Sequence, residues 1–267
     1  MNYRTQTIII TGASAGIGAA FARELAQRGA NLVLVARRRD RLDALAAELR
    51  AAHGVAVTPV ALDLSSPTAA AELRAVVSRE QVHPTALINN AGFGTFGHFV
   101  DDELELLQRE IAVDISAPVQ LSSEFLPDII AARGFLINVA SMAGYSATPR
   151  MAVYGAAKAF VLSWSESLWA ELRGTGVTVF ALSPGATSTE FNDVVGTEDA
   201  TAGARKRTPE NVVATGLAHL ERRNPGPNVI DGPSNRASAA LVRLVSRRAS
   251  AGMMYRLTDP ARRNRTA

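Results

Sequence analysis

The sequence predicts an α/β fold with one doubly wound parallel sheet of about seven strands and helices on both faces. Short apolar, β-branched runs recur along the chain, and they are hydrophobic throughout, as expected for strands covered on both faces. Segments with helical spacing of apolar residues separate these runs. Strand–helix–strand repeats of this kind form right-handed crossovers of a parallel sheet. The 267 residues suit a single domain of this class.

Six of the strands can be placed from the sequence. They are expected at residues 7–10, 31–36, 55–62, 85–89, 135–140 and 177–183. Helices are expected at 16–29 and 39–53. In the second of these, Leu42, Leu45 and Leu49 recur at helical spacing, and Gly54 follows where a helix stop belongs.

Two later segments differ from this pattern. Residues 186–208 are polar and rich in Gly, Ala and Thr, and we expect a long mobile loop there. Residues 243–267 form a basic C-terminal tail, so the predicted domain covers residues 1–242.

Composition excludes several classes of function. The chain has no cysteine, so disulfides, thiol catalysis and cysteine-ligated metals are excluded. Its four histidines are scattered, and no metal site is expected. We find no signal-peptide pattern before the first strand and no apolar run near the roughly 18 residues of a membrane span, so a cytoplasmic location is expected.

The charge distribution argues against a nucleic-acid partner. The sequence pI is about 9.7, but the excess positive charge lies in the tail, which has seven arginines and one acid from Arg243 onward. The whole chain carries +3, so residues 1–242 are net negative by three charges. Residues 243–257 mix arginines with apolar residues, and they could form an amphipathic helix on an anionic membrane or partner. The alternatives are a tail packed on its own subunit or disordered.

A glycine-rich turn follows the first predicted strand. The segment "TGASAGIG" (11–18) places Gly12, Gly16 and Gly18 in a G-x-x-x-G-x-G pattern at the start of a helix. Glycines let the backbone approach a pyrophosphate, which is then stabilised by the positive end of the helix. This turn, with Ser14 and Ile17, predicts dinucleotide binding.

The end of the second predicted strand indicates which dinucleotide. NAD-binding proteins place an acid there for the ribose 2′-hydroxyl. Here Ala36 is followed by Arg37, Arg38 and Arg39, and a guanidinium suits a 2′-phosphate. The sequence therefore favours NADP(H) over NAD(H), unless these arginines simply begin a solvated helix. After the third strand, the carboxylate of Asp63, followed by Leu64, can accept from an adenine amine.

A tyrosine and a lysine lie four residues apart in an apolar helix. Tyr154 and Lys158 share one helix face, where the ammonium is expected to lower the pKa of the phenol. Such a phenol could exchange a proton with a carbonyl or an alcohol. The alternative is a core tyrosine beside a lysine that extends to solvent. Ser141 follows a strand, at the edge where open α/β sheets bind ligands, and can orient the same oxygen.

Five segments occur together in one order: "TGASAGIG" (11–18), "NNAG" (89–92), Ser141, "YGAAK" (154–158) and "PGATSTEF" (184–191). With them the chain resembles the short-chain dehydrogenase/reductase family over nearly its whole length, and in two segments its bacterial ketoacyl-reductase-like members. The resemblance implies a Rossmann-type fold with Ser141, Tyr154 and Lys158 as catalytic residues. It also implies that Lys158 holds the nicotinamide ribose and that Asn90 steadies the sheet.

The cofactor-binding residues expected from the motifs and the resemblance are Gly12, Ser14, Gly16, Ile17, Gly18, Arg37, Arg38, Asp63, Leu64, Asn90, Ala91, Gly92, Tyr154, Lys158, Pro184, Gly185, Thr187 and Thr189.

One position departs from the family pattern. The family has a catalytic asparagine on the helix after the fourth strand, and here Asp114 stands at that position. No asparagine occurs between Asn90 and Asn138, so a shift in alignment does not restore it. We therefore count Asp114 as the fourth catalytic residue, in place of the asparagine.

These observations predict an NADPH-dependent oxidoreductase acting on a carbonyl or alcohol. The alternatives are a non-catalytic dinucleotide-binding regulator and a sugar-nucleotide epimerase or dehydratase. An apolar substrate is expected from candidate pocket residues Phe93, Phe96, Phe99, Met142, Tyr145, Met151 and Phe191. The resemblance also implies a homodimer or homotetramer built on helices within 102–131 and 152–173.

Overall fold

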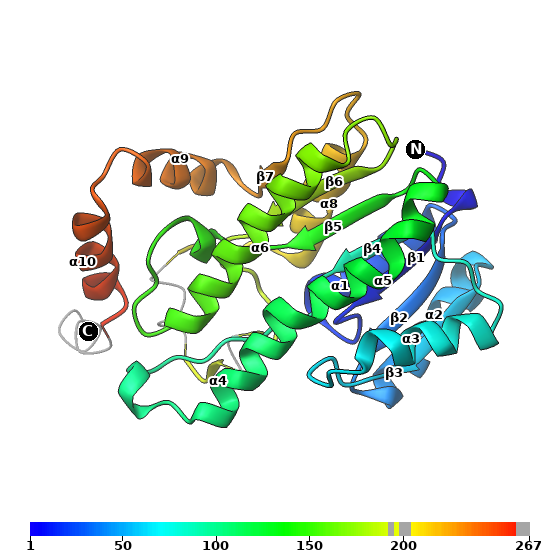
Figure 1. Ribbon diagram of the computed structural model, residues 1–267, viewed down its shortest axis with the longest axis horizontal. Coiled ribbons are helices and arrows are strands. Elements are labelled where there is room, and N and C mark those ends of the chain that lie inside the picture. Colours follow the sequence, from blue (N-terminus) through cyan, green and yellow to red (C-terminus); the bar gives the residue numbers. More distant parts are fainter. Residues whose placement is uncertain (192–194, 198–203, 260–267) are drawn as a thin grey trace.

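The computed structural model describes residues 1–191, 195–197 and 204–259 (Figure 1). Within them, seven strands form one sheet in the order β3-β2-β1-β4-β5-β6-β7, and every pairing is parallel. The strands are β1 (Thr7–Thr11), β2 (Asn31–Ala36), β3 (Val57–Ala61), β4 (Ala86–Asn89), β5 (Phe135–Val139), β6 (Thr178–Ser183) and β7 (Asn228–Ile230). The doubly wound sheet predicted from the sequence is confirmed.

Helices cover both faces of this sheet. The first four are α1 (Gly16–Gln27), α2 (Arg39–His53), α3 (Ala69–Arg79) and α4 (Leu104–Ile111). A π-helical segment, η3 (Ala112–Ser116), joins α4 to α5 (Ala117–Ala131). Next come the short turn η4 (Met142–Tyr145) and the helices α6 (Ala152–Glu171), α8 (Pro209–Leu220), α9 (Pro233–Val242) and α10 (Arg247–Leu257).

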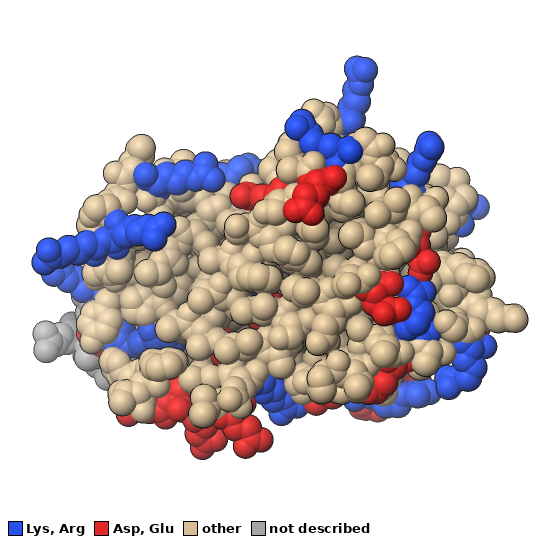
Figure 2. All heavy atoms as spheres, in the orientation of Figure 1, with Lys and Arg blue, Asp and Glu red and all other residues tan. Residues whose placement is uncertain are grey.

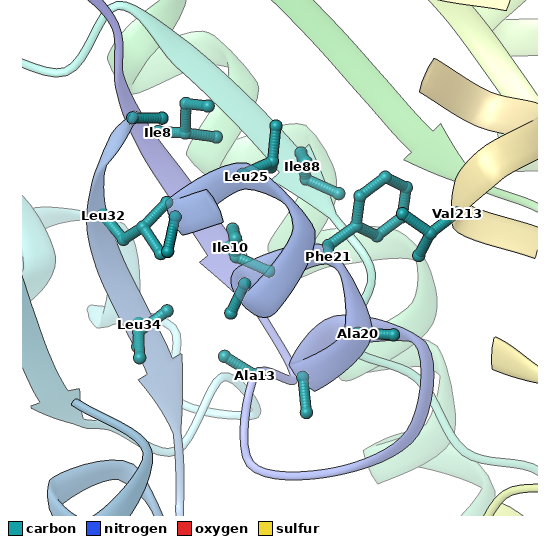
Figure 3. Packing of buried hydrophobic residues seen from close by; sticks show 14 of the residues in the cluster. Ile8, Ile10, Ala13, Ala20, Phe21, Leu25, Leu32, Leu34, Ile88 and Val213 are labelled. Carbon is teal, nitrogen blue, oxygen red and sulfur yellow. The ribbon is translucent and has the colours of Figure 1, made fainter. Parts of the chain in front are cut away.

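Two apolar layers hold the helices on the sheet. On one face, Phe21 and Leu25 of α1 pack with Ile10 of β1 and with Val213 of α8 (Figure 3). On the other face, α3, α5 and α6 pack on Ile9 of β1, Leu87 of β4 and Leu136 of β5, around the fully buried Phe125. Since both faces are covered, the central strands are apolar at most positions, which explains why they lack a regular alternation of apolar and polar residues.

The placed strands agree with the sequence prediction to within two residues at each end. The predicted run 55–62 is shorter in the structure, because residues 55 and 56 precede β3. The short edge strand β7, with three residues, was not located from the sequence. The predicted loop 186–208 lies partly outside the described residues, at 192–194 and 198–203.

The C-terminal helices lie at the end of the molecule opposite α2 and α3 (Figure 1). In the space-filling view, basic side chains gather over α9 and α10, whereas acidic ones gather below, near α4 (Figure 2).

The guanidinium of Arg150 donates to the backbone oxygen of Tyr255 at 2.9 Å and to the hydroxyl of Thr258 at 3.1 Å. The described part of the tail is thus helical and bonded to the domain; the arginines after 259 lie outside the described residues. No helix among the described residues is long and apolar enough to cross a membrane.

Candidate active site

The candidate site lies at the carboxyl ends of the central strands. Strand β1 is flanked by β2 on one side and β4 on the other: the chain winds from β1 through β2 to β3 in one direction, and then crosses from β3 to β4 on the other side of β1. Open α/β sheets bind ligands at such a point. The side chain of Asn90 bridges the two strand ends, since its Nδ2 donates to the backbone oxygen of Thr11 at 2.8 Å. This places Asn90 in the sheet-steadying position that the resemblance implies.

The glycine turn requires its glycines. Gly12 has φ +66° and Gly16 φ +54°, in the left-handed region that favours glycine. A Cβ atom on Gly12 would lie 2.8 Å from Nδ2 of Asn90 and 2.9 Å from Cα of Ala91. A Cβ atom on Gly18 would collide with the Gly12 carbonyl oxygen. Ala15, which precedes α1, provides no side-chain cap, so the first helical N–H groups have no capping side chain.

The arginines after β2 reach toward this turn. Arg38 donates from Nε and Nη2 to the hydroxyl of Ser14, at 3.2 and 3.0 Å. Its Nη1 lies 2.8 Å from a carboxylate oxygen of Glu190, which also pairs with Arg41. The neighbouring Arg37 is exposed. The structure therefore brings Arg38, more than Arg37, to the phosphate-binding turn.

Asp63 is already engaged by protein groups. Its Oδ1 accepts from the backbone N–H and the hydroxyl of Ser65, at 3.0 and 2.8 Å. Its Oδ2 accepts from Arg109 of α4 at 3.0 Å. An adenine amine would have to share Asp63 with these donors. Leu64, next to it, is buried.

The segment after β6 crosses the glycine turn. The carbonyl oxygen of Pro184 accepts from the backbone N–H of Met142 at 2.9 Å. Thr187 donates to the Gly185 carbonyl oxygen at 3.0 Å. The methyl carbon of Thr189 lies 3.0 Å from where a Cβ atom of Gly16 would be. Of the predicted cofactor residues in this segment, Thr189 therefore lies against the glycine turn.

Helix α6 carries Tyr154 and Lys158, and buried polar contacts fix it on the sheet. Nδ2 of Asn138, on β5, donates to the hydroxyl of Ser165 at 2.9 Å. Asn89, on β4, donates to Oδ1 of Asn138 at 2.9 Å, so amides of two strands and α6 form one network. Hydrogen bonds between buried amides favour one arrangement of the elements they join, although Oδ1 of Asn89 has no hydrogen-bond partner among the described residues.

Lys158 forms a buried ion pair with Asp114. Its Nζ lies 2.7 Å from Oδ1 of Asp114, and the side chains are 6% and 0% exposed. Nζ also donates to the Val139 carbonyl oxygen at 3.3 Å, and Oδ2 of Asp114 accepts from the Phe93 N–H at 3.1 Å. A Cβ atom on Gly92 would lie 2.6 Å from Oδ1 of Asp114, so glycine is needed there. The side chain of Asp114, and not only its backbone, belongs to the site.

Burial shifts the pKa values of Tyr154, Lys158 and Asp114. Burial raises the pKa of the Tyr154 phenol above its ordinary value; Lys158 opposes this, and the Asp114 charge adds to it. The expected lowering of the Tyr154 pKa is therefore wrong, because burial outweighs the influence of the nearby ammonium and the Asp114 carboxylate adds to the effect of burial. For Lys158, burial alone would lower the pKa, but Asp114 outweighs it and the pKa is raised. Burial also raises the pKa of Asp114, against the influence of Lys158.

Ser141 lies where the sequence predicts it, just beyond β5. Its hydroxyl accepts from the Ala143 N–H at 3.1 Å, which caps the turn η4. A hydrogen bond between Ser141 and Tyr154 favours the ionised form of the phenol. The four predicted catalytic residues are thus brought together from β5, η3 and α6.

Glu110 is a member of this site that the sequence reasoning missed. It is 0% exposed, and its Oε2 accepts from the Thr95 hydroxyl at 3.0 Å, while Oε1 has no hydrogen-bond partner. Burial raises the pKa of Glu110 to about 7, and the Asp114 charge adds to this. Its place one helical turn before Asp114 is the signal that would have identified it.

Apolar side chains surround the Tyr154 ring. The ring of Phe191 lies 5.2 Å from it, and a Cβ atom on Gly94 would lie 3.0 Å from both Tyr154 and Met151. Phe99, another predicted pocket residue, is 64% exposed to solvent and does not line an enclosed pocket.

Comparisons with known proteins identify the family. The model of the short chain dehydrogenase family matches residues 6–200. A "Short chain dehydrogenase" from Pseudocercospora fijiensis is 36% identical over 189 residues, which cover 70% of this chain and 61% of the relative.

Two solved structures are similar over nearly the whole chain. A short-chain dehydrogenase from Sphingobium yanoikuyae in complex with NADPH is 35% identical, with a TM-score of 0.79, over 90% of this chain and 93% of that one. A 7beta-hydroxysteroid dehydrogenase is 30% identical, with a TM-score of 0.84, over 95% and 99%. With the family match, the strand order and the Ser–Tyr–Lys grouping, these similarities establish that the chain belongs to the short-chain dehydrogenase family of oxidoreductases.

Proposed function

We propose that this protein is an NADPH-dependent oxidoreductase that transfers a hydride between the nicotinamide and a carbonyl or alcohol carbon of an apolar small molecule. The grouping of Tyr154, Lys158 and Ser141 beside the glycine turn carries this proposal. A regulator that only binds a dinucleotide has no need for a phenol with a buried ammonium and a hydroxyl.

The residues present fit a phosphorylated dinucleotide. At Gly12 and Gly16 no side chain separates the backbone of the turn from a bound pyrophosphate. Helix α1 begins there without a capping side chain, so its first N–H groups can donate to the phosphates. Arg38 supplies a guanidinium at the end of β2, where NAD-binding proteins have an acid. When bound, the nicotinamide supplies or accepts the hydride.

Tyr154 acts as the proton donor and acceptor. Its raised pKa keeps the phenol neutral near pH 7, which suits donation to a carbonyl oxygen during reduction. Ser141, which bonds the same phenol, orients the substrate oxygen. Lys158 stabilises the phenolate that remains, and Asp114 holds Lys158 in its cationic form.

The substrate is proposed to be apolar. Phe191 and Met151 lie beside Tyr154, where a substrate carbonyl has to approach. The similar 7beta-hydroxysteroid dehydrogenase, by its name, acts on a steroid, which is consistent with this class.

The decisive test of function follows NADPH fluorescence with purified protein and a panel of bulky and small ketones. Consumption of NADPH that requires both ketone and Tyr154 supports the proposal. Tight NADPH binding without turnover on any ketone, or on any alcohol with NADP⁺, would favour the regulator instead. Turnover of a sugar nucleotide without net change in cofactor would favour the epimerase.

The cofactor preference is tested by binding. Wild type is expected to bind NADPH more tightly than NADH, and Arg38→Ala is expected to lose this preference, since Arg38 contacts the glycine turn. Arg37→Ala serves as the comparison, because Arg37 is exposed like Arg38 but has no bond to the glycine turn within the described residues. Tighter binding of NADH by wild type would overturn the assignment.

A homodimer or homotetramer is also proposed, with the protein in the cytoplasm. Leu104, Ile111 and Val119 on the α4–α5 side are exposed, as is Phe160 on α6. These helices are the ones through which the resemblance implies association. Light scattering during gel filtration measures the mass; a monomer at micromolar concentration would contradict the oligomer.

A further inference from the structure

Glu190 connects the two sides of the cofactor groove. It follows β6, on the side proposed for the nicotinamide, yet its carboxylate pairs with arginines at the start of α2. Oε2 lies 2.8 Å from Nη1 of Arg38, and Oε1 lies 2.5 Å from Nη1 of Arg41. Both arginines hold the pKa of Glu190 below its usual range, so this carboxylate is ionised at neutral pH.

The carboxylate and a 2′-phosphate require the same donors. Arg38 already uses Nε and Nη2 on the hydroxyl of Ser14, which leaves Nη1 as the donor that points to Glu190. A phosphate dianion at the end of β2 is recognised by guanidinium N–H groups of this kind. Glu190 therefore occupies the position on Arg38 and Arg41 that suits the additional phosphate of NADP(H).

This contact is of a kind that a ligand can replace. The side chains of Arg38, Glu190 and Arg41 are 42%, 43% and 44% exposed. Exposed ion pairs contribute little free energy, and a dianion binds a pair of arginines more strongly than one carboxylate does. The competition is expected to change affinity severalfold and not to block binding.

The neighbours of Glu190 extend the contact to the site. Thr189 lies against Gly16 of the glycine turn, and Phe191 lies against Tyr154 with 5.2 Å between ring centroids. Three consecutive residues thus contact the phosphate-binding turn, the arginines and the proposed proton donor. Glu190 and Phe191 are adjacent in the chain, so the arginines and the Tyr154 ring are connected through neighbouring residues.

We propose that Glu190 is a specificity-determining residue: it takes the place of the 2′-phosphate on Arg38 and Arg41 until NADP(H) displaces it, and this displacement is transmitted to Tyr154 through Phe191. The inference deepens the proposed function, because it rests on a cofactor with a 2′-phosphate.

The test uses two ligands that differ only in the 2′-phosphate, adenosine 2′,5′-bisphosphate and 5′-AMP, titrated by calorimetry. Glu190→Gln is expected to bind the bisphosphate about threefold to tenfold more tightly than wild type, with 5′-AMP unchanged, because one competing charge is lost. Asp40→Asn is the matched control. The charge of Asp40 also acts on Arg41, but within the described residues its carboxylate forms no ion pair with Arg38 or Arg41. Its effect is expected to stay below twofold.

The outcomes separate this inference from the proposed cofactor preference. If Glu190→Gln changes both affinities equally, or neither, the inference is overturned. If wild type binds both ligands equally but Glu190→Gln still gains selectively for the bisphosphate, the NADPH preference fails and the competition stands.

Transmission to Tyr154 has its own measurement, amide exchange at residues 188–191. The bisphosphate, and not 5′-AMP, is expected to raise exchange in wild type, and neither ligand to raise it in Glu190→Gln. Equal exchange with and without the bisphosphate in wild type would overturn the link through Phe191.

Discussion

Oδ1 of Asp114 lies 2.7 Å from Nζ of Lys158, and both side chains are buried. The family pattern has an uncharged asparagine at this position, so this chain has an additional negative charge beside its ammonium. The charge offsets the influence of Lys158 on Tyr154, and the phenol is less acidic than the Tyr–Lys pair alone would suggest.

The first prediction is that Asp114→Asn moves the pH–rate profile of alcohol oxidation to lower pH. Oxidation requires the phenolate as base, and the Asp114 charge raises the pKa of Tyr154, so its removal lowers that pKa. The measurement is a pair of profiles at saturating cofactor.

A control accompanies this experiment, because removing one partner of a buried pair costs about 3–5 kcal/mol of stability. Thermal unfolding must show that Asp114→Asn is folded at the assay temperature. Asp101→Asn removes an exposed carboxylate and is expected to leave the profile unchanged. Superimposable curves for Asp114→Asn and wild type would mean that Asp114 carries no charge that Tyr154 experiences.

The second prediction is that Tyr154→Phe lowers turnover by roughly 100-fold or more and leaves NADPH binding largely intact. Proton transfer by a positioned group contributes about 10²–10⁴-fold, while the glycine turn and Arg38 hold the phosphates. Tyr145→Phe is the matched control, since Tyr145 bonds Ser183 at 3.3 Å and has no proposed proton-transfer role. If the activity of Tyr154→Phe stays within tenfold of wild type, Tyr154 is not the proton donor and acceptor.

The third prediction concerns Glu110 and the pH dependence of stability. Its pKa is raised by burial from 4.5 to about 7, so the unfolded chain releases this proton at lower pH than the folded one. This group's contribution is complete below pH 4.5 and is lost as the pH rises through about 7, a loss of roughly 3 kcal/mol.

Glu110→Gln removes this dependence. The free energy of unfolding is measured with urea at pH 5 and pH 8. Relative to wild type, the variant is expected to be more stable at pH 8 than at pH 5. Glu105→Gln, which changes an exposed residue of the same helix, is expected to follow wild type. A constant difference between Glu110→Gln and wild type at both pH values would contradict the elevated pKa.

The fourth prediction compares two glycines with the same backbone conformation. Gly12 and Gly54 both have φ +66°, so alanine at either costs about 1 kcal/mol of backbone strain. Only at Gly12 would the new methyl group meet other atoms, Nδ2 of Asn90 and Cα of Ala91; at Gly54 nothing lies within 4 Å. Gly12→Ala is therefore expected to unfold at lower denaturant concentration than Gly54→Ala and to lose dinucleotide binding. Equal stability and dinucleotide binding of the two variants would exclude the close packing of Gly12 against Asn90 and Ala91.

The sequence predicted the sheet well because burial on both faces leaves apolar runs that periodicity detects. It did not locate β7, whose three residues lie at the sheet edge and are only partly buried. So short a strand depends on pairing with β6 for its existence, and no local pattern encodes that pairing.

The catalytic grouping was predictable from spacing and resemblance, whereas its electrostatics were not. The pKa of Tyr154 depends on burial and on a carboxylate contributed by another helix, and both are properties of the fold. Glu110 and Glu190 were missed for the same reason. One is identified by complete burial, and the other by ion pairs with residues about 150 positions earlier in the chain.

The parallel sheet also has a consequence for the rate of folding. Within the described residues, neighbouring strands are all parallel and none is joined to the next by a hairpin; the central pair aligns Ile8 with Ala86. Closing such distant contacts costs chain entropy before any burial compensates, so domains of this topology fold more slowly than helical bundles of equal stability. The ligand-binding edge is complete only after β6 has joined β5, and a chain interrupted before Thr178 presents the glycine turn without the segment that crosses it.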